Sequence, residues 1–188
     1  MRLLSQGRAV VDVGGGSRFM KGMKKYEPLF AYCRYFTLDA SAFYRPGVVG
    51  DIHRLPLATA SVDGLLCRSV LEHVDRPWDA CREIHRVLRP GGLAFLVVPS
   101  IYPDHARHGD GAYPDHWRFF ESSIRLMLRP FSEVTVQKHG GWFQAMSNFL
   151  PFQARMRGPL DLASRLLDAA FRTSRRRTTP LFSALARK

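Results

Sequence analysis

The sequence predicts an α/β protein: a three-layer α/β/α sandwich with a mostly parallel sheet whose last strand is antiparallel. Short β-branched runs alternate with longer amphipathic stretches along the chain, the pattern of a parallel sheet covered by helices on both faces. The run at 9–13 breaks directly into three glycines, as a buried parallel strand does when it enters a tight turn. We expect Ser17 to cap a helix after that turn.

The remaining elements follow from local patterns. Strands are expected near 8–13, 34–39, 47–51, 62–67 and 93–98. The stretch from Pro77 to Leu88 has apolar residues at helical spacing and ends at Pro-Gly-Gly, which predicts a helix. Its expected buried residues are Trp78, Cys81, Ile84, Val87 and Leu88. A further helix is expected at about 121–129, a strand at 133–138, and a last strand at 181–186 that pairs antiparallel with the one before it.

Length and composition fit one soluble domain. The 188 residues, 46% hydrophobic, suffice for one core, and we assign 1–188 to a single domain with a helical insertion at about 141–178. The three cysteines form no Cys-x-x-Cys pair, which favours a reduced setting. No apolar run approaches the roughly 20 residues of a membrane span, and the N-terminus has no secretory apolar region. These features together predict a cytoplasmic protein.

The glycine turn indicates a ligand site. Gly14, Gly15 and Gly16 allow a ligand to approach the backbone closely. The acid at Asp12 favours a positively charged ligand and would repel a pyrophosphate. A dinucleotide-binding turn also needs a glycine or alanine where this chain has Phe19.

The segment 11–17, Val-Asp-Val-Gly-Gly-Gly-Ser, resembles the first motif of the class I methyltransferases that use S-adenosylmethionine (SAM), a family with a Rossmann-like fold. Four later segments resemble further motifs of this family in the same order: 35–39, 50–56, 62–74 and 83–92. Five motifs in register over 8–99 are more specific than any one of them. One departure is Arg18, where the family often has glycine.

The resemblance implies SAM as cofactor and a set of residues that bind it: Asp12, Gly14, Gly15, Gly16, Asp39, Asp51, Ile52 and Ser69. Asp39 would accept hydrogen bonds from the ribose hydroxyls, and Asp51 would lie beside the adenine amino group with Ile52 against the ring. Asp12 would hold the glycine turn or the amino group of the methionine part. The alternative for each carboxylate is an ordinary turn or helix-capping role.

The substrate side is expected in the loop after the fifth strand, because loops on a rigid scaffold tend to carry function. His105 and His116 are candidate bases for removing a proton from an O or N nucleophile, and Asp115 and Arg118 are candidate substrate contacts. The segment 115–119 resembles the Asp-Tyr-Trp-Arg-Phe signature of a bacterial subgroup that modifies glycans or small metabolites, with His116 in place of tyrosine. The alternative is that Trp117 and Phe119 anchor the core and that Arg118 pairs with an acid.

The sequence favours neither a catalytic role for His73 nor a metal site. His73 belongs to a family motif, yet local packing is favoured for it over catalysis. No cluster of residues has metal-ligand spacing, so no metal is expected.

The main functional hypothesis is a SAM-dependent methyltransferase that acts on an O or N atom of a small-molecule or glycan- or lipid-linked acceptor. The net charge of +12 raises the alternative of an RNA methyltransferase. Against nucleic acid, the chain lacks an Asn/Asp-Pro-Pro-aromatic motif after the fourth strand and a cysteine beside proline. The third hypothesis is a catalytically inactive binding or regulatory protein with the same fold.

The C-terminal segment carries much of the charge. Residues 151–188 hold nine basic residues and two acidic ones. Apolar residues recur at helical spacing over 160–171, and an apolar patch precedes them: Trp142, Phe143, Met146, Phe149, Leu150 and Phe152. An arginine-rich amphipathic helix with aromatic anchors suits an anionic membrane surface. The alternative, which we favour at this level, is a lid that packs its apolar face over the active site.

Overall fold

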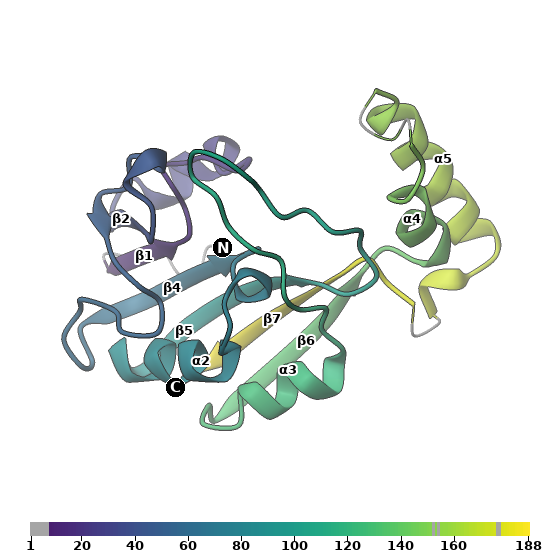
Figure 1. Cartoon of the computed structure of the whole chain (residues 1–188). Helices are drawn as coiled ribbons and strands as arrows, with labels where there is room; N and C mark the ends of the chain where they lie inside the picture. Colours follow the sequence, from purple (N-terminus) through teal and green to yellow (C-terminus); the bar gives the residue numbers. More distant parts are fainter. Residues whose placement is uncertain (1–7, 152, 154, 176–177) are drawn as a thin grey trace.

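The computed structural model describes residues 8–151, 153, 155–175 and 178–188. Its centre is a seven-stranded sheet with the order β3-β2-β1-β4-β5-β7-β6 (Figure 1). The strands are β1 (Ala9–Val13), β2 (Arg34–Asp39), β3 (Val48–Val49), β4 (Val62–Arg68), β5 (Leu88–Pro99), β6 (Glu133–His139) and β7 (Leu181–Arg187). Strands β1 to β5 pair in parallel, and β7 is antiparallel to both β5 and β6. The predicted fold class is therefore confirmed.

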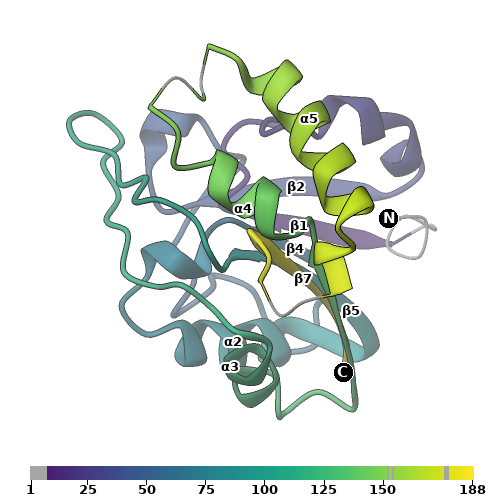
Figure 2. The same ribbon diagram turned by 90° about the vertical axis from the view of Figure 1, so that its right-hand side faces the viewer.

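The helices of the described chain are α2 (Pro77–Val87), α3 (Glu121–Met127), α4 (Trp142–Ser147) and α5 (Arg157–Ala170). The described residues also form four 3-10 segments: η1 (Lys24–Phe30), η2 (Ala42–Tyr44), η3 (Leu71–His73) and η4 (Thr173–Arg175). Helices α2 and α3 lie side by side against one face of the sheet (Figures 1 and 2).

Each face of the sheet has its own core, because successive residues of a strand point to opposite faces. Val11 of β1 and Leu65 of β4 belong to the larger cluster, which contains the buried residues of α2 and α3. Their neighbours Val10 and Leu66 belong to a smaller cluster on the other face, packed with residues of the segment 19–35. Both clusters hold β1 and β4 in the middle of the sheet.

The helix expected after the glycine turn is absent, so Ser17 caps none. Residues 14–23 form successive turns, and the next element is η1. Phe19 and Lys21 have positive φ angles of 61° and 52°, which a right-handed helix cannot contain. Phe19 and Met23 are nevertheless buried on the sheet. The segment thus covers the smaller core without forming a helix.

Helix α2 also corrects two expectations. It ends at Val87, and Leu88 already belongs to β5. Trp78 is 43% exposed instead of buried, and its ring packs edge-on against Trp117 at 5.9 Å. The reason is angular: the buried positions of α2 include Pro77 and Cys81, and Trp78 lies about 100° around the helix from Pro77.

Helices α4 and α5 occupy the connection from β6 to β7. Since β6 runs parallel to β5, its carboxyl end lies at the same edge of the sheet as the glycine turn. The two helices pack on each other beyond that edge, apart from α2 and α3 (Figure 2). Among the described residues, no helix is both long enough and apolar enough to span a bilayer.

Candidate functional site

A cavity of about 1180 Å³ opens at the carboxyl edge of the sheet, beside the ends of β1 and β4. This is the position where the strand order reverses, the usual ligand site of a parallel α/β sheet. The lining comes from the glycine turn, the ends of β2 and β4, the loop after β5, and the helices α4 and α5. The cavity therefore joins segments from both ends of the chain.

The glycine turn forms one end of the cavity. Gly14 and Gly16 have φ angles of 69° and 61°, in the left-handed region that favours glycine. A Cβ on Gly14 would lie 2.2 Å from Cγ2 of Val70. The Gly14 N–H donates to the carbonyl of Leu38 at 2.7 Å, which ties the turn to the end of β2. The glycines are thus required by both conformation and space.

Asp39 lies next to this turn, at the end of β2, and lines the cavity. Its carboxylate accepts the Gly16 N–H at 3.2 Å and the Ser41 N–H at 3.1 Å. Each carboxylate oxygen keeps a further lone pair for another donor. Ser69 also lines the cavity, with φ of 52° and its N–H bonded to the carbonyl of Val97.

Asp12 lies beneath the turn and outside the cavity lining. Its side chain is 2% exposed and accepts the Tyr35 hydroxyl at 2.6 Å. Burial raises the pKa of Asp12, and the hydrogen bond from Tyr35 opposes this rise. A Cβ on Gly15 would lie 2.8 Å from the Asp12 carboxyl carbon, so the carboxyl group packs directly against the turn.

Two further predicted cofactor residues are not brought to the cavity lining. Asp51 is exposed, and its carboxylate binds the backbone N–H and the Nδ1 of His53. Ile52 is buried in the larger core. Both follow β3, the two-residue edge strand.

On the other side of the cavity, the loop after β5 presents His105. The Asp115 carboxylate accepts the His105 backbone N–H at 2.9 Å and lies 3.0 Å from its Nδ1. Arg118 binds both oxygens of Asp115 at 2.6 Å. Burial raises the pKa of Asp115, but these hydrogen bonds lower it to about 2. Asp115 and Arg118 therefore position His105 and do not themselves line the cavity, and the pairing of Arg118 with an acid matches the alternative interpretation.

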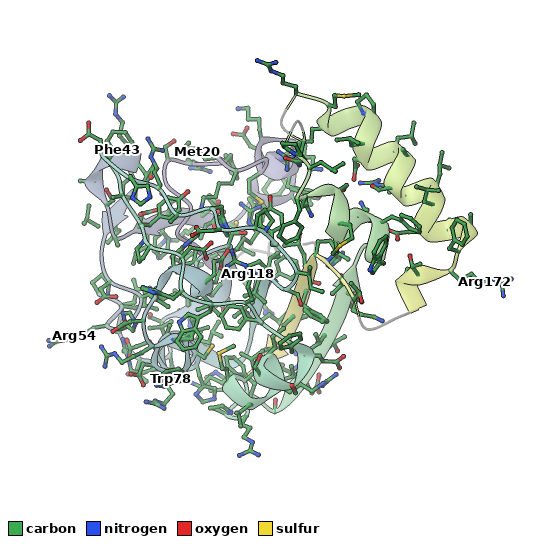
Figure 3. The ribbon with its side chains drawn as sticks, turned by 45° about the vertical axis from the view of Figure 1, so that its right-hand side comes forward. Met20, Phe43, Arg54, Trp78, Arg118 and Arg172 are labelled. Atoms are coloured by element: carbon green, nitrogen blue, oxygen red, sulfur yellow. The ribbon has the colours of Figure 1, made fainter. Side chains whose placement is uncertain are left out.

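The other residues of this loop have mixed positions. His116 is exposed and outside the cavity lining, so His105 is the candidate base that the structure brings to the cavity. Phe119 is buried as a core anchor, whereas Trp117 is partly exposed and donates its Nε1–H to the carbonyl of Val74. Arg118 is partly buried, with 26% of its side chain exposed, and its label lies near the middle of the view in Figure 3.

Glu72 and His73 also line the cavity, next to His105. One oxygen of Glu72 lies 3.6 Å from Nε2 of His105 and 3.9 Å from Nε2 of His73. Glu72 raises the pKa of His105, and partial burial opposes this effect. Sequence spacing showed no metal-ligand cluster, but the fold brings the ligand atoms of these three residues within 4.8 Å of one another. Local spacing missed the cluster since its members come from two separate loops.

Helices α4 and α5 supply the third side of the cavity through polar residues that sequence analysis missed: Gln144, Ser147, Asn148, Arg157, Asp161 and Arg165. The expectation of an inward apolar face is wrong for Leu166, Leu167 and Phe171, which are 63%, 41% and 65% exposed. The buried residues of α5 are instead Ser164 and Asp168. Phe152 of the expected apolar patch lies outside the described residues.

Comparison with known proteins agrees with this geometry. Residues 12–96 match a family model described as a methyltransferase domain. An uncharacterized methyltransferase of Mycobacterium avium (strain 104) is 38% identical over 102 residues, which span 48% of this chain and 39% of that protein. The chain thus covers about two fifths of the curated relatives that it matches.

Solved structures share the fold. A SAM-dependent methyltransferase from Archaeoglobus fulgidus superposes with a TM-score of 0.63 at 13% identity, covering 99% of this chain and 88% of that one. Phosphoethanolamine N-methyltransferase 2 of Haemonchus contortus, solved with SAM, gives a TM-score of 0.60 at 13% identity, covering 98% of this chain and 49% of that one. Residues 12–96 of this chain thus resemble a methyltransferase domain, and the chain has the fold of SAM-dependent methyltransferases.

Proposed function

We propose that this chain binds SAM at the glycine turn and transfers its methyl group to an O or N atom of an acceptor held beside His73 and His105. The observation that carries the proposal is the single cavity that joins Asp39 and the glycine turn to these two histidines. A cofactor and an acceptor bound in one cavity would be in contact, as group transfer requires, and this supports the proposal.

The residues of the turn fit the cofactor. Gly14 and Gly16 present bare backbone at the cavity, and Asp39 offers acceptor lone pairs for two vicinal hydroxyls. When bound, SAM would supply a methyl group on a positively charged sulfur, and the carboxylates of the site suit that charge. The chain's own task is to hold the acceptor in line and to exclude competing water.

The acceptor side favours a small or linked polar acceptor. His73, His105, Tyr102 and Tyr113 line this part of the cavity, and together they offer aromatic surfaces and hydrogen-bonding groups. The Haemonchus contortus protein is named for a small phosphorylated amine, which supports a small-molecule acceptor by analogy. A glycan-linked or lipid-linked acceptor fits the same chemistry, and its polar end would enter the cavity.

Calorimetric titration with SAM and with its demethylated product tests the cofactor site. Asp39→Ala removes the acceptor for the ribose hydroxyls and should weaken binding about tenfold or more, since a hydrogen bond to a charged group contributes about 1.5–3 kcal/mol. Glu121→Ala, which removes an exposed carboxylate on α3, is the matched control and should bind normally. Equal affinities for all three proteins would exclude Asp39 from the site.

The acceptor class requires a transfer assay. Isotope-labelled SAM is incubated with the protein and with a metabolite, glycolipid or RNA fraction. Label in the first two supports the proposal, whereas label in RNA supports a nucleic-acid methyltransferase. Binding of SAM without transfer to any fraction supports an inactive binding protein.

We also propose that α5 contacts an anionic membrane surface, as a lipid-linked acceptor would require. The exposed apolar residues on and next to α5 are Leu162, Leu166 and Phe171. Arg172 extends outwards just beyond the end of this helix (Figure 3). Sedimentation with phosphatidylglycerol vesicles should carry down the wild type, and Leu166→Asp should reduce this binding. Leu126→Asp on α3, with similar exposure of 57%, is the control and should leave it unchanged. Absence of vesicle binding at low and moderate salt would refute the membrane contact.

A further inference from the structure

The Glu72 carboxylate is buried without a hydrogen-bond partner. Its residue is 0% exposed, and among the described residues neither of its oxygens meets a donor at hydrogen-bond distance. A buried carboxylate in this state carries a large desolvation cost. Its side chain nevertheless borders the cavity. Such a group indicates a binding partner that the protein atoms do not supply.

The two imidazoles beside Glu72 are oriented as ligands. Nδ1 of His73 lies 2.6 Å from the carbonyl oxygen of Pro114, and since a carbonyl only accepts, this Nδ1 carries the proton. Nδ1 of His105 lies 3.0 Å from the Asp115 carboxylate, which Arg118 holds in place. When Nδ1 donates to an oxygen acceptor, the Nε2 lone pair is left available, and metal-binding histidines are commonly oriented this way.

Both Nε2 atoms face the same oxygen of Glu72, at 3.6 Å for His105 and 3.9 Å for His73. These separations exceed a hydrogen bond. A cation about 2.1 Å from each ligand atom needs the ligands roughly 3.0–3.5 Å apart, so small side-chain adjustments would close the set.

We propose that Glu72, His73 and His105 form a binding site for a divalent transition-metal ion at the acceptor end of the cavity. Two imidazole nitrogens with one carboxylate suit Zn²⁺, Fe²⁺ or Mn²⁺ better than Ca²⁺ or Mg²⁺, which prefer oxygen ligands. Three protein ligands leave coordination positions open towards the cavity. If the methyltransferase function holds, an acceptor hydroxyl would bind there, and His105 would serve as a ligand instead of a base.

The site is tested on metal-stripped, untagged, cofactor-free protein. Calorimetry with Zn²⁺ should show one strong site, and Co²⁺ should give visible absorption bands typical of nitrogen and oxygen ligands. Glu72→Gln keeps the shape of the side chain but removes its charge, and His105→Ala removes one ligand. Each should weaken the site at least tenfold and abolish the Co²⁺ bands, whereas the exposed His116→Ala on the same loop should bind as the wild type does.

Two outcomes would overturn the proposal: no strong Zn²⁺ site in the wild type, or equal binding by the wild type and Glu72→Gln. The first would leave His105 and Glu72 as a metal-free pair, with His105 available as a base. A thermal melt of each variant checks folding, and only wild-type and His116→Ala stability should rise with Zn²⁺. Because no SAM is present, failure here is separate from failure of the cofactor titration.

Discussion

The two ends of the cavity are held in place by different forces. At the glycine turn, β1 and β4 are buried on both faces, and residues such as Val11 and Leu65 are fully covered. Helices α4 and α5 have few buried apolar side chains, and α5 buries Ser164 and Asp168 while Leu166 is exposed. Hydrophobic burial therefore fixes the glycine-turn end of the cavity, and hydrogen bonds fix the end formed by α4 and α5.

This difference has a consequence for dynamics. Segments with few buried apolar contacts open more easily than the core that supports them. The glycine-turn end of the cavity should therefore be more rigid than the end formed by α4 and α5.

The largest expected effect comes from removing Asp168. Its buried carboxylate accepts the N–H groups of Gly141, Phe143 and Gln144 at 2.9–3.2 Å, together with the Thr173 hydroxyl. Asp168→Ala leaves those donors at the start of α4 unsatisfied, which should cost about 3 kcal/mol locally. Hydrogen exchange at α4 and α5 should accelerate roughly a hundredfold, while the β1 and β4 amides stay protected.

The control for this experiment is Asp161→Ala. Asp161 also lies on α5 and binds Gln144 and Arg165, but its carboxylate is partly exposed, so the loss should be small. Equal loss of protection in β1 and β4 on replacing Asp168 would show that both ends of the cavity unfold as one unit.

The sequence predicts the sheet well because its signals are local. Each central strand is a β-branched or apolar run bounded by turn residues, as at Val10–Val13 and Val62–Cys67, and the buried interior of a parallel sheet requires such runs. The glycine turn and the acid at the end of β2 are also contiguous signals. These features locate the sheet edge and the cavity without any long-range contact.

The parts that sequence analysis missed depend on contacts between distant segments. Asp168 reads as one acid of an amphipathic helix, and only the fold shows it capping α4. Glu72 reads as part of a motif, and only the loop after β5 brings His105 to it. Helical spacing likewise placed Trp78 in the core, although its angle on α2 sets it at the edge beside Trp117.

The smallest expected effect concerns Glu83 on α2, the helix that packs its buried residues into the larger core. Its carboxylate binds Arg86 at 2.7 and 2.8 Å and accepts the Leu55 N–H at 3.0 Å. The hydrogen bond from Arg86 lowers the pKa of Glu83 below its ordinary value of 4.5. A lowered folded-state pKa stabilises the fold above the unfolded value, and this stabilisation is lost as the pH falls through the folded one.

Glu83→Gln should therefore lower stability by about 1 kcal/mol at pH 7, or roughly 2–4 °C in Tm. The difference from the wild type should shrink below about pH 4.5, where the unfolded carboxylate protonates, and vanish at lower pH. Glu121→Gln, from a half-exposed pair with Arg125 on α3, should change Tm little at any pH. A Glu83→Gln deficit that persists unchanged at low pH would assign the loss to side-chain packing instead of charge. Glu83 supports the loop that contains Leu55, beside the larger core. The loss of stability in Glu83→Gln should therefore appear in global unfolding and leave hydrogen exchange at α4 and α5 unchanged. This result would be a second, independent measurement that distinguishes the two regions.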